Sequence, residues 1–280
     1  MTQNLYKLTT SVAIILWSLS AVLLSHLSTP PIEGLIITTT IASSLIAAKI
    51  TWQKNWQKLM KHKKQIMLTG IFLSMNNLGY YLSFRYISAT LIDIICWLWP
   101  AILLTTHSFI YKNKLNFKTK AAILLSTIAV LIIHPIRIDI IDNNFLIGIA
   151  LSFLATFAWC GYSLVTNKYK NIPSEFFIIS VALALPFLIL LHFLFEPNIT
   201  PSTQDWKILL TLGLGPASIA FFCWDYSLKK GPLNIVTISS CCIPIFSIII
   251  LIFFNKANFS INLLEAMFLL AISNILVIKS

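Results

Sequence analysis

The amino-acid sequence predicts an all-α integral membrane protein with ten transmembrane helices, arranged as two inverted repeats of five helices each. Three observations predict this fold: a very apolar composition, long apolar stretches along the whole chain, and an uneven distribution of lysine between the connections. Hydrophobic residues make up 58% of the 280 residues and charged residues only 10%. Soluble domains carry about 25% charged residues, so we expect most of this chain to contact lipid or protein rather than water.

Each apolar stretch is long enough to cross a hydrocarbon core of about 30 Å as a helix. The connections are short, which leaves no room for a soluble domain, and we expect the first span to act as an uncleaved signal-anchor. The ten predicted spans are residues 9–26, 32–50, 66–86, 89–110, 119–135, 145–166, 174–195, 206–227, 232–254 and 260–278.

The basic residues fall mostly on one side of the predicted membrane. Of the 20 Lys and Arg residues, only Arg85, Arg137, Lys207 and Lys256 lie on the side opposite the N-terminus. Positive charge is retained in the cytoplasm, so this bias predicts that both termini are cytoplasmic. The net charge of +11 is therefore explained by topology and does not indicate nucleic-acid binding. The lysines within 49–64 are placed to contact anionic lipid headgroups.

No catalytic or cofactor site emerges from the sequence. The cysteines lie within predicted spans, without the spacing of metal ligands and away from external loops where disulfides form. Nucleophile triads, phosphate-binding glycine loops and metal motifs are also missing from the sequence. We therefore expect no enzyme activity, no cofactor and no metal. With only 8 glycines, the chain has no strong dimerisation face of small residues, and we expect a monomer in the bilayer.

The two halves of the chain, residues 1–140 and 141–280, are predicted to be the inverted repeats. Five spans in each half is an odd number, so the second half must cross the membrane in the opposite direction. Residues 81–102 align without gaps over residues 225–246, and this pairing supports a common origin. Inverted repeats are typical of secondary transporters, whose substrate site lies at the repeat interface near the midplane.

Pro100 and Pro244 occupy equivalent positions in this alignment and are predicted to be hinges. Neither proline has an N–H group, so each leaves free the carbonyl four residues earlier. Free backbone groups at membrane depth are tolerated only where protein or a water-filled cavity satisfies them. The alternative is an ordinary packing kink.

Trp17, Trp97 and Trp99 lie too deep in the predicted spans to belong to the tryptophan belts at the two interfaces, whereas Trp159 lies nearer the inner third of its span and has a stronger belt alternative. Residues 8–10 positions into a span lie roughly 12–15 Å below the surface, at 1.5 Å per residue. The candidate substrate-binding residues are Trp17, Asn76, Asn77, Tyr80, Tyr81, Trp97, Trp99, Trp159 and Asp225. Their rings are suited to enclose a flat apolar group or a cation, and the asparagines to bind its polar end.

Each candidate has a simpler alternative role. The aromatic residues could pack against other helices or face lipid, and the asparagines could bridge two helices. Asp225 could pair with Lys229 at helical i,i+4 spacing. Trp97 and Trp99 are two positions apart, about 200° around a helix, so we expect only one of them to face a cavity, with Trp99 favoured.

Four segments resemble the ten-span drug/metabolite transporter superfamily of the EamA type, and within it the bacterial aromatic amino acid exporters. They are VAIILWS (12–18), WLWPAI (97–102), AWCGYSLVTNKYK (158–170) and FFCWDYSLKKGPLNIVTI (221–238). The resemblance implies a central pocket between the repeats, at positions Trp17, Tyr80, Tyr81, Trp97, Trp99 and Trp159. The chain departs from those exporters at Cys96-Trp97, where they carry Asn-Tyr, and near Asn77, where they carry an acid.

The function expected from these features is secondary transport across the bacterial inner membrane. The first hypothesis is export of aromatic amino acids or similar small metabolites by alternating access. The alternative is an importer or exchanger of a cationic metabolite such as S-adenosylmethionine, bound by cation–π contact with the same indoles. A membrane scaffold without transport activity is the third hypothesis.

Overall fold

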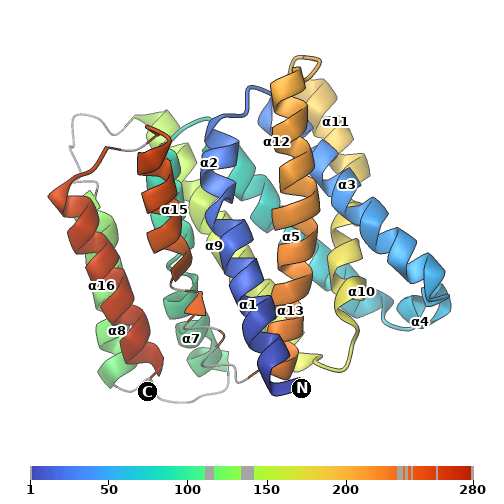
Figure 1. The fold of residues 1–280 in the computed structure, drawn as a ribbon, viewed down its shortest axis with the longest axis horizontal. Coiled ribbons are helices and arrows are strands. Elements are labelled where there is room, and N and C mark those ends of the chain that lie inside the picture. Colours follow the sequence, from blue (N-terminus) through green and yellow to red (C-terminus); the bar gives the residue numbers. More distant parts are fainter. Residues whose placement is uncertain are drawn as a thin grey trace.

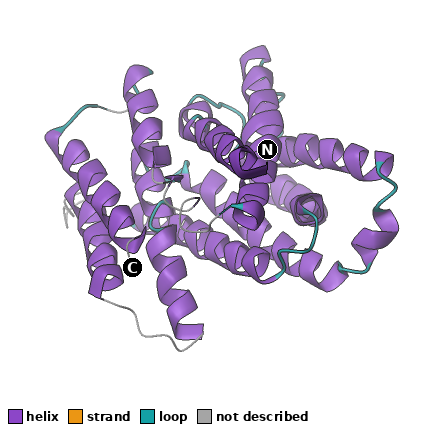
Figure 2. Ribbon diagram, turned by 60° about the horizontal axis from the view of Figure 1, so that its bottom comes forward, coloured by secondary structure: helices purple, strands orange, loops and turns teal. Residues whose placement is uncertain are grey.

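The computed structural model describes residues 2–110, 117–133, 142–231, 236, 239–240, 242–256 and 258–278. Over these residues the chain forms helices and no strand, which confirms the all-α class (Figure 1; Figure 2). The helices are α1 (Thr2–Ser18), α2 (Ser20–Ser25), α3 (Pro31–Trp52), α4 (Trp56–Met60), α5 (Lys63–Ser83), α6 (Ala89–Cys96), α7 (Trp99–Ile110), α8 (Phe117–Ile133), α9 (Asn143–Lys168), α10 (Ser174–Ile178), η2 (Ile179–Ala184), α11 (Leu185–Phe195), α12 (Thr203–Leu214), η3 (Gly215–Ala220), α13 (Phe221–Lys230), α15 (Cys242–Phe253) and α16 (Ile261–Ile278).

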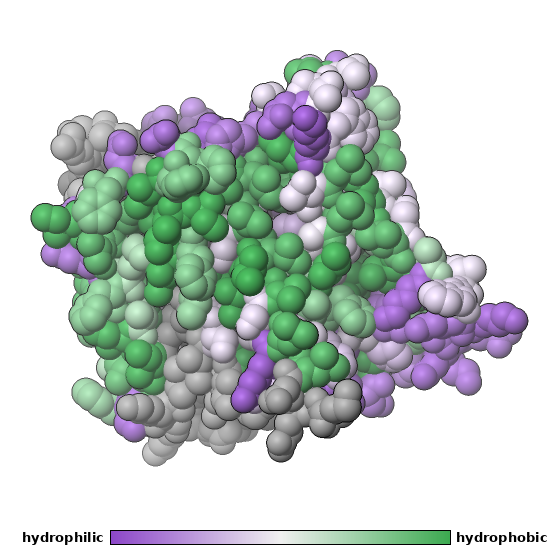
Figure 3. Space-filling view, viewed as in Figure 1, coloured by the Kyte–Doolittle hydropathy of each residue, from purple (hydrophilic) through white to green (hydrophobic). Residues whose placement is uncertain are grey.

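Five helical stretches in the described part of the chain are long and apolar enough to cross a membrane. They are Leu5–Ser25, Pro31–Trp52, Asn143–Thr166, Ser174–Phe195 and Thr203–Lys230. On the face of the molecule in Figure 3, apolar residues form a broad middle zone, and hydrophilic residues gather at its rims. This distribution is typical of a protein surface that contacts lipid.

The helices form one bundle, with the pair α8 and α16 at one side and α3, α10 and α11 at the other (Figure 1). Both chain ends lie at the same end of the bundle in this view. Helix α5 packs along α9 and η2 because two of its glycines allow close approach. A Cβ atom on Gly79 would lie 2.7 Å from the Leu151 carbonyl oxygen, and one on Gly70 would lie 2.7 Å from that of Ser180.

The fourth predicted span, 89–110, is not one continuous helix. Helix α6 ends at Cys96 and α7 begins at Trp99, so Pro100 is the second residue of α7. The first turn of a helix tolerates proline because its N–H would have no intrahelical partner there. Pro244 is likewise the third residue of α15. Both predicted hinge prolines therefore lie at helix starts, and the hinge role remains a prediction.

Side chains of helix α9 bond to the backbone on both sides of this break. Thr156 Oγ1 donates to the Ile95 carbonyl at 3.3 Å, and Cys160 Sγ donates to the Trp99 carbonyl at 3.3 Å. The two donors are four residues apart, so they lie on the same face of α9. These contacts add to the turn bond in which the Leu98 N–H donates to the Ile95 carbonyl at 3.1 Å.

Candidate functional site

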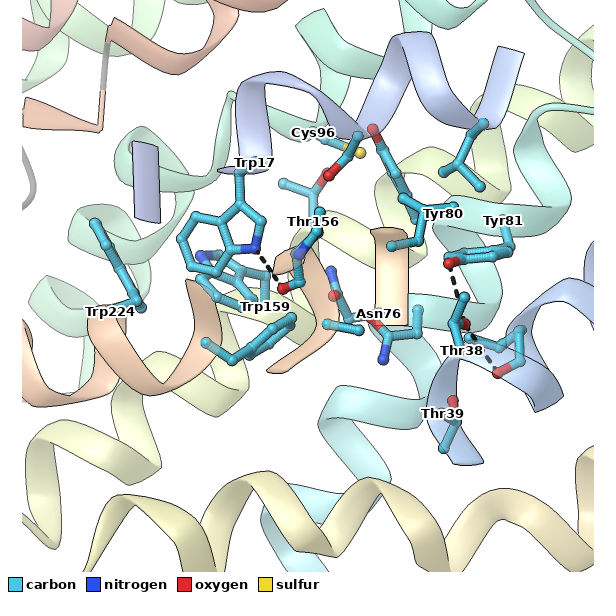
Figure 4. Close-up of a pocket in the computed structure, with 18 of the residues that line it drawn as sticks. Trp17, Thr38, Thr39, Asn76, Tyr80, Tyr81, Cys96, Thr156, Trp159 and Trp224 are labelled. Atoms are coloured by element: carbon cyan, nitrogen blue, oxygen red, sulfur yellow. Dashed lines mark hydrogen bonds between the residues drawn. The ribbon is translucent and has the colours of Figure 1, made fainter. Parts of the chain in front are cut away.

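A cavity of about 150 Å³ lies inside the bundle. A cavity of this volume, roughly 150 Å³, holds a benzene molecule in an engineered protein core. Its walls come from the first, second, third, fourth, sixth and eighth predicted spans, so both halves of the chain contribute (Figure 4). The lining residues are Trp17, Ser20, Leu24, Leu35, Thr38, Thr39, Asn76, Asn77, Tyr80, Tyr81, Cys96, Trp97, Trp99, Thr156, Trp159, Leu212, Pro216, Ala217, Phe221 and Trp224.

The structure brings eight of the nine predicted binding residues together at this cavity, although they are widely separated in the sequence. They are Trp17, Asn76, Asn77, Tyr80, Tyr81, Trp97, Trp99 and Trp159. The ninth, Asp225, is not among the lining residues. The participation of all nine in substrate binding remains a prediction.

The aromatic wall is built from indoles of four different helices. Trp17 of α1 and Trp159 of α9 have ring centroids 5.5 Å apart at an interplanar angle of 89°. Trp99 of α7 lies edge-on to Trp159 at 6.3 Å and to Trp224 of α13 at 6.1 Å. Edge-to-face pairs are favoured because the positive ring edge meets the negative face, and each contributes about 0.5–1.5 kcal/mol beyond its buried area.

A hydrogen bond fixes the orientation of Trp17. Its Nε1 donates to the Pro216 carbonyl at 3.1 Å, shown as a dashed line in Figure 4. Pro216 lies in η3, a π-helical turn between α12 and α13. Such turns widen a helix locally and occur often at functional sites. The π-helical turn was not predicted from the sequence, although Gly215-Pro216 interrupts the apolar run 206–227 and indicates an irregular helix there.

The polar wall lies on α3 and α5. Thr38 Oγ1 and Tyr81 Oη are 3.2 Å apart, and Asn76 Nδ2 donates to the Ala155 carbonyl at 2.9 Å. Asn76 therefore makes the helix-bridging bond that was its simpler alternative, while its neighbour Asn77 also lines the cavity. Thr38 was not predicted, because a threonine in an apolar helix commonly bonds its own backbone. Thr38 does so as well, donating to the Gly34 carbonyl at 2.9 Å.

Both Trp97 and Trp99 line the cavity. The expectation that only one of them could reach it is wrong, because it assumed a continuous helix. The chain turns at residues 97–98, between α6 and α7. Trp97 is therefore outside both helices, and the angular rule for helical positions does not apply to it.

Asp225 forms a buried ion pair with Lys229, which is the simpler role that its sequence position also allowed. Lys229 Nζ lies 2.5 Å from Asp225 Oδ2, and the two side chains are 7% and 0% exposed. The Tyr162 hydroxyl donates to Asp225 at 3.2 Å, and Lys229 donates to the Ile172 carbonyl at 2.7 Å. Because Tyr162 also packs on Trp159, with centroids 5.2 Å apart, this ionic cluster lies next to the aromatic wall.

Two further lining residues, Phe221 and Trp224, lie three positions apart on α13. They fall within the segment FFCWDYSLKK that carries the family resemblance, but they were not among the predicted binding residues. The described residues contain no group of His, Cys, Asp and Glu that could hold a metal ion.

This chain is similar to a protein family, to a characterised bacterial protein and to a solved structure. The model of the EamA-like transporter family matches residues 6–134 and 146–279. A protein of Ancylobacter novellus described as aromatic amino acid exporter YddG is 24% identical over 253 residues, which cover 86% of this chain and 85% of that protein. A crystal structure described only as that of a protein has the same fold, with a TM-score of 0.76, 21% identity and coverage of 98% of this chain and 96% of that one.

Proposed function

The chain belongs to the EamA-like transporter family, and we propose that it exports aromatic amino acids or similar small metabolites across a bacterial inner membrane. The observation that carries the proposal is the cavity of about 150 Å³ at which indoles from four helices converge. Its volume suits a benzene-sized ring. The similarity to a protein described as an aromatic amino acid exporter supports the same substrate class.

The lining residues divide the binding of such a substrate between two walls. The apolar ring would pack against the indoles around Trp159, and the polar end would face the amide and hydroxyl groups near Asn77 and Thr38. A ligand pocket of mainly aromatic side chains with a few polar groups is typical of small-molecule sites.

The proposal includes ten spans in two inverted repeats, residues 1–140 and 141–280, with both termini cytoplasmic. Two matches of one family model, one in each half, support the repeats. Both termini lie at the same end of the bundle in Figure 1, which supports an even number of spans. A Pro-x-Glu sequence also begins both α3, at Pro31 and Glu33, and the α10 segment, at Pro173 and Glu175.

The same two segments support alternating access, because they run antiparallel and are held by ionic groups at both ends. At one end, Glu196 accepts hydrogen bonds from the backbone N–H groups of Ile32 at 2.9 Å and Glu33 at 3.0 Å, at the start of α3. At the other end, Lys49 of α3 pairs with Glu175 of α10 at 3.6 Å. Carboxylates are favoured at helix N-termini, and a glutamate at each end thus holds the two halves of the chain together, by backbone hydrogen bonds at one end and by an ion pair at the other.

A cationic metabolite such as S-adenosylmethionine is the second candidate substrate. The observation that favours it is the character of the cavity wall, which has five indoles and no charged side chain among its described residues. Indole faces attract cations without a charged partner.

Exchange in proteoliposomes tests both candidates. Proteoliposomes that contain the purified protein would be loaded with one unlabelled compound and supplied outside with the same compound in labelled form, phenylalanine in one series and S-adenosylmethionine in the other. We expect uptake of labelled phenylalanine, and we expect Trp159→Ala to lower it at least tenfold. Trp206→Ala, at an exposed position, should leave it unchanged. Uptake of labelled S-adenosylmethionine without any phenylalanine exchange would favour the second candidate. Exchange of neither compound would contradict both.

A further inference from the structure

Two tryptophans of the cavity wall carry N–H groups that have no hydrogen-bond acceptor in the described part of the chain. They are Trp99 Nε1 on α7 and Trp224 Nε1 on α13. Trp99 is 4% exposed and Trp224 is 1% exposed, and both line the cavity. Trp17 also lines the cavity, but its N–H group already has a partner, the Pro216 carbonyl.

Buried polar groups nearly always have a partner, and a buried donor without one lowers stability. The indole N–H is a donor only, so its missing partner must be an acceptor. The two rings are neighbours, with centroids 6.1 Å apart and planes at 88°, so both donors belong to the same part of the cavity wall. No charged side chain of the described cavity wall competes for that group.

We propose that Trp99 and Trp224 together bind the carboxylate of the transported substrate; this inference rests on the proposed function. A carboxylate offers two oxygens and about four acceptor sites, which is enough for two N–H donors. Neutral donors suit a zwitterion, because they bind the carboxylate without repelling the ammonium group of the same molecule. The substrate class is therefore a small aromatic compound that bears a carboxylate.

The two N–H groups are enclosed by neighbouring side chains. In the proposed mode, each indole rotates about its side-chain torsions when the substrate binds, so that its N–H group reaches the cavity. The contact is then made as the substrate enters, and it is lost again on release, as a carrier requires. The break between α6 and α7 lies directly before Trp99, which is the first residue of α7.

The variants Trp99→Phe and Trp224→Phe test the proposal, because each keeps an aromatic ring and removes only the N–H group and part of the indole. Binding of three ligands to the purified protein would be measured by thermal shift: phenylalanine, phenethylamine without the carboxylate, and 3-phenylpropionate without the amine. We expect each variant to weaken phenylalanine and 3-phenylpropionate about tenfold, equal to 1.4 kcal/mol. The affinity for phenethylamine should change less than twofold.

Two controls separate this role from simple packing. Trp206→Phe, at an exposed position of α12, should change none of the three affinities. Trp17→Phe should weaken all three ligands alike, because the Trp17 N–H group already bonds Pro216. Equal losses for all three ligands in the Trp99 and Trp224 variants would overturn the carboxylate subsite and leave the proposed function intact. A wild-type protein that binds none of the three would overturn the proposed substrate class, and the subsite with it.

Discussion

Lys49 Nζ, in the last turn of α3, lies 3.6 Å from Glu175 Oε2, in the first turn of α10. This ion pair joins residues far apart in the sequence and fastens the first half of the chain to the second. Lys49 also lies 3.9 Å above the ring of Phe222, so the lysine side chain contacts both α10 and α13. The Glu175 side chain is only 11% exposed, which limits screening by solvent.

Reversal of this ion pair gives the first prediction. Glu175→Lys should lower the unfolding temperature of the detergent-solubilised protein, because it places two ammonium groups together at a partly buried contact. The double variant Lys49→Glu with Glu175→Lys should recover most of the loss. Exposed pairs contribute about 0.2–1 kcal/mol, and Lys49 is 33% exposed, so we expect a shift of a few degrees. A double variant no more stable than Glu175→Lys would contradict the pairing.

The buried pair of Asp225 and Lys229 gives the second prediction. Asp225→Ala should destabilise the protein by about 3–5 kcal/mol, because it leaves the Lys229 charge buried without its counter-ion. The double variant Asp225→Ala with Lys229→Met removes both charges and should recover at least half of that loss. Chemical denaturation followed by tryptophan fluorescence measures both. If the single and the double variant were equally unstable, Asp225 would stabilise the protein through contacts other than its ion pair with Lys229.

The close approach of α5 and α9 gives the third prediction. Gly79→Ala should destabilise the fold by about 1–3 kcal/mol, the usual cost of overpacking, because its Cβ would lie 2.7 Å from the Leu151 carbonyl oxygen. Gly34→Ala is the matched control. There the nearest atom is the flexible end of Leu27, at 3.1 Å, so thermal unfolding should be nearly unchanged. The reverse order of the two variants would rule out the tight contact.

The hydrogen bond of Trp17 gives the fourth prediction. Trp17→Phe keeps an aromatic ring but removes the donor to the Pro216 carbonyl. Loss of one partner of a buried hydrogen bond costs about 1–3 kcal/mol, and we expect slower phenylalanine exchange as η3 loses its contact with α1. Proteoliposome exchange and thermal unfolding should both decline. Unchanged exchange with lower stability would limit this bond to a structural role.

The sequence was informative about the candidate cavity because deep aromatic residues are unusual within a membrane. Trp17, Trp97 and Trp99 stand out by their distance from the span ends, and the structure brings all three to one cavity together with Trp159. Thr38 and Pro216 do not stand out, since a threonine that bonds its own helix and a proline in an apolar run have ordinary explanations. Only packing partners distinguish them.

The sequence alone determined the helical class, the family and the apolar surface, because these depend on composition, on the lengths of apolar runs and on local residue order. It could not locate the break at residues 97–98, beside which two side chains of α9 bond to backbone carbonyls. Nor could it distinguish Asp225 in the cavity from Asp225 paired with Lys229. Tertiary structure decided these points, since a polar group in an apolar interior takes the nearest partner in space, and that partner often comes from a distant part of the sequence.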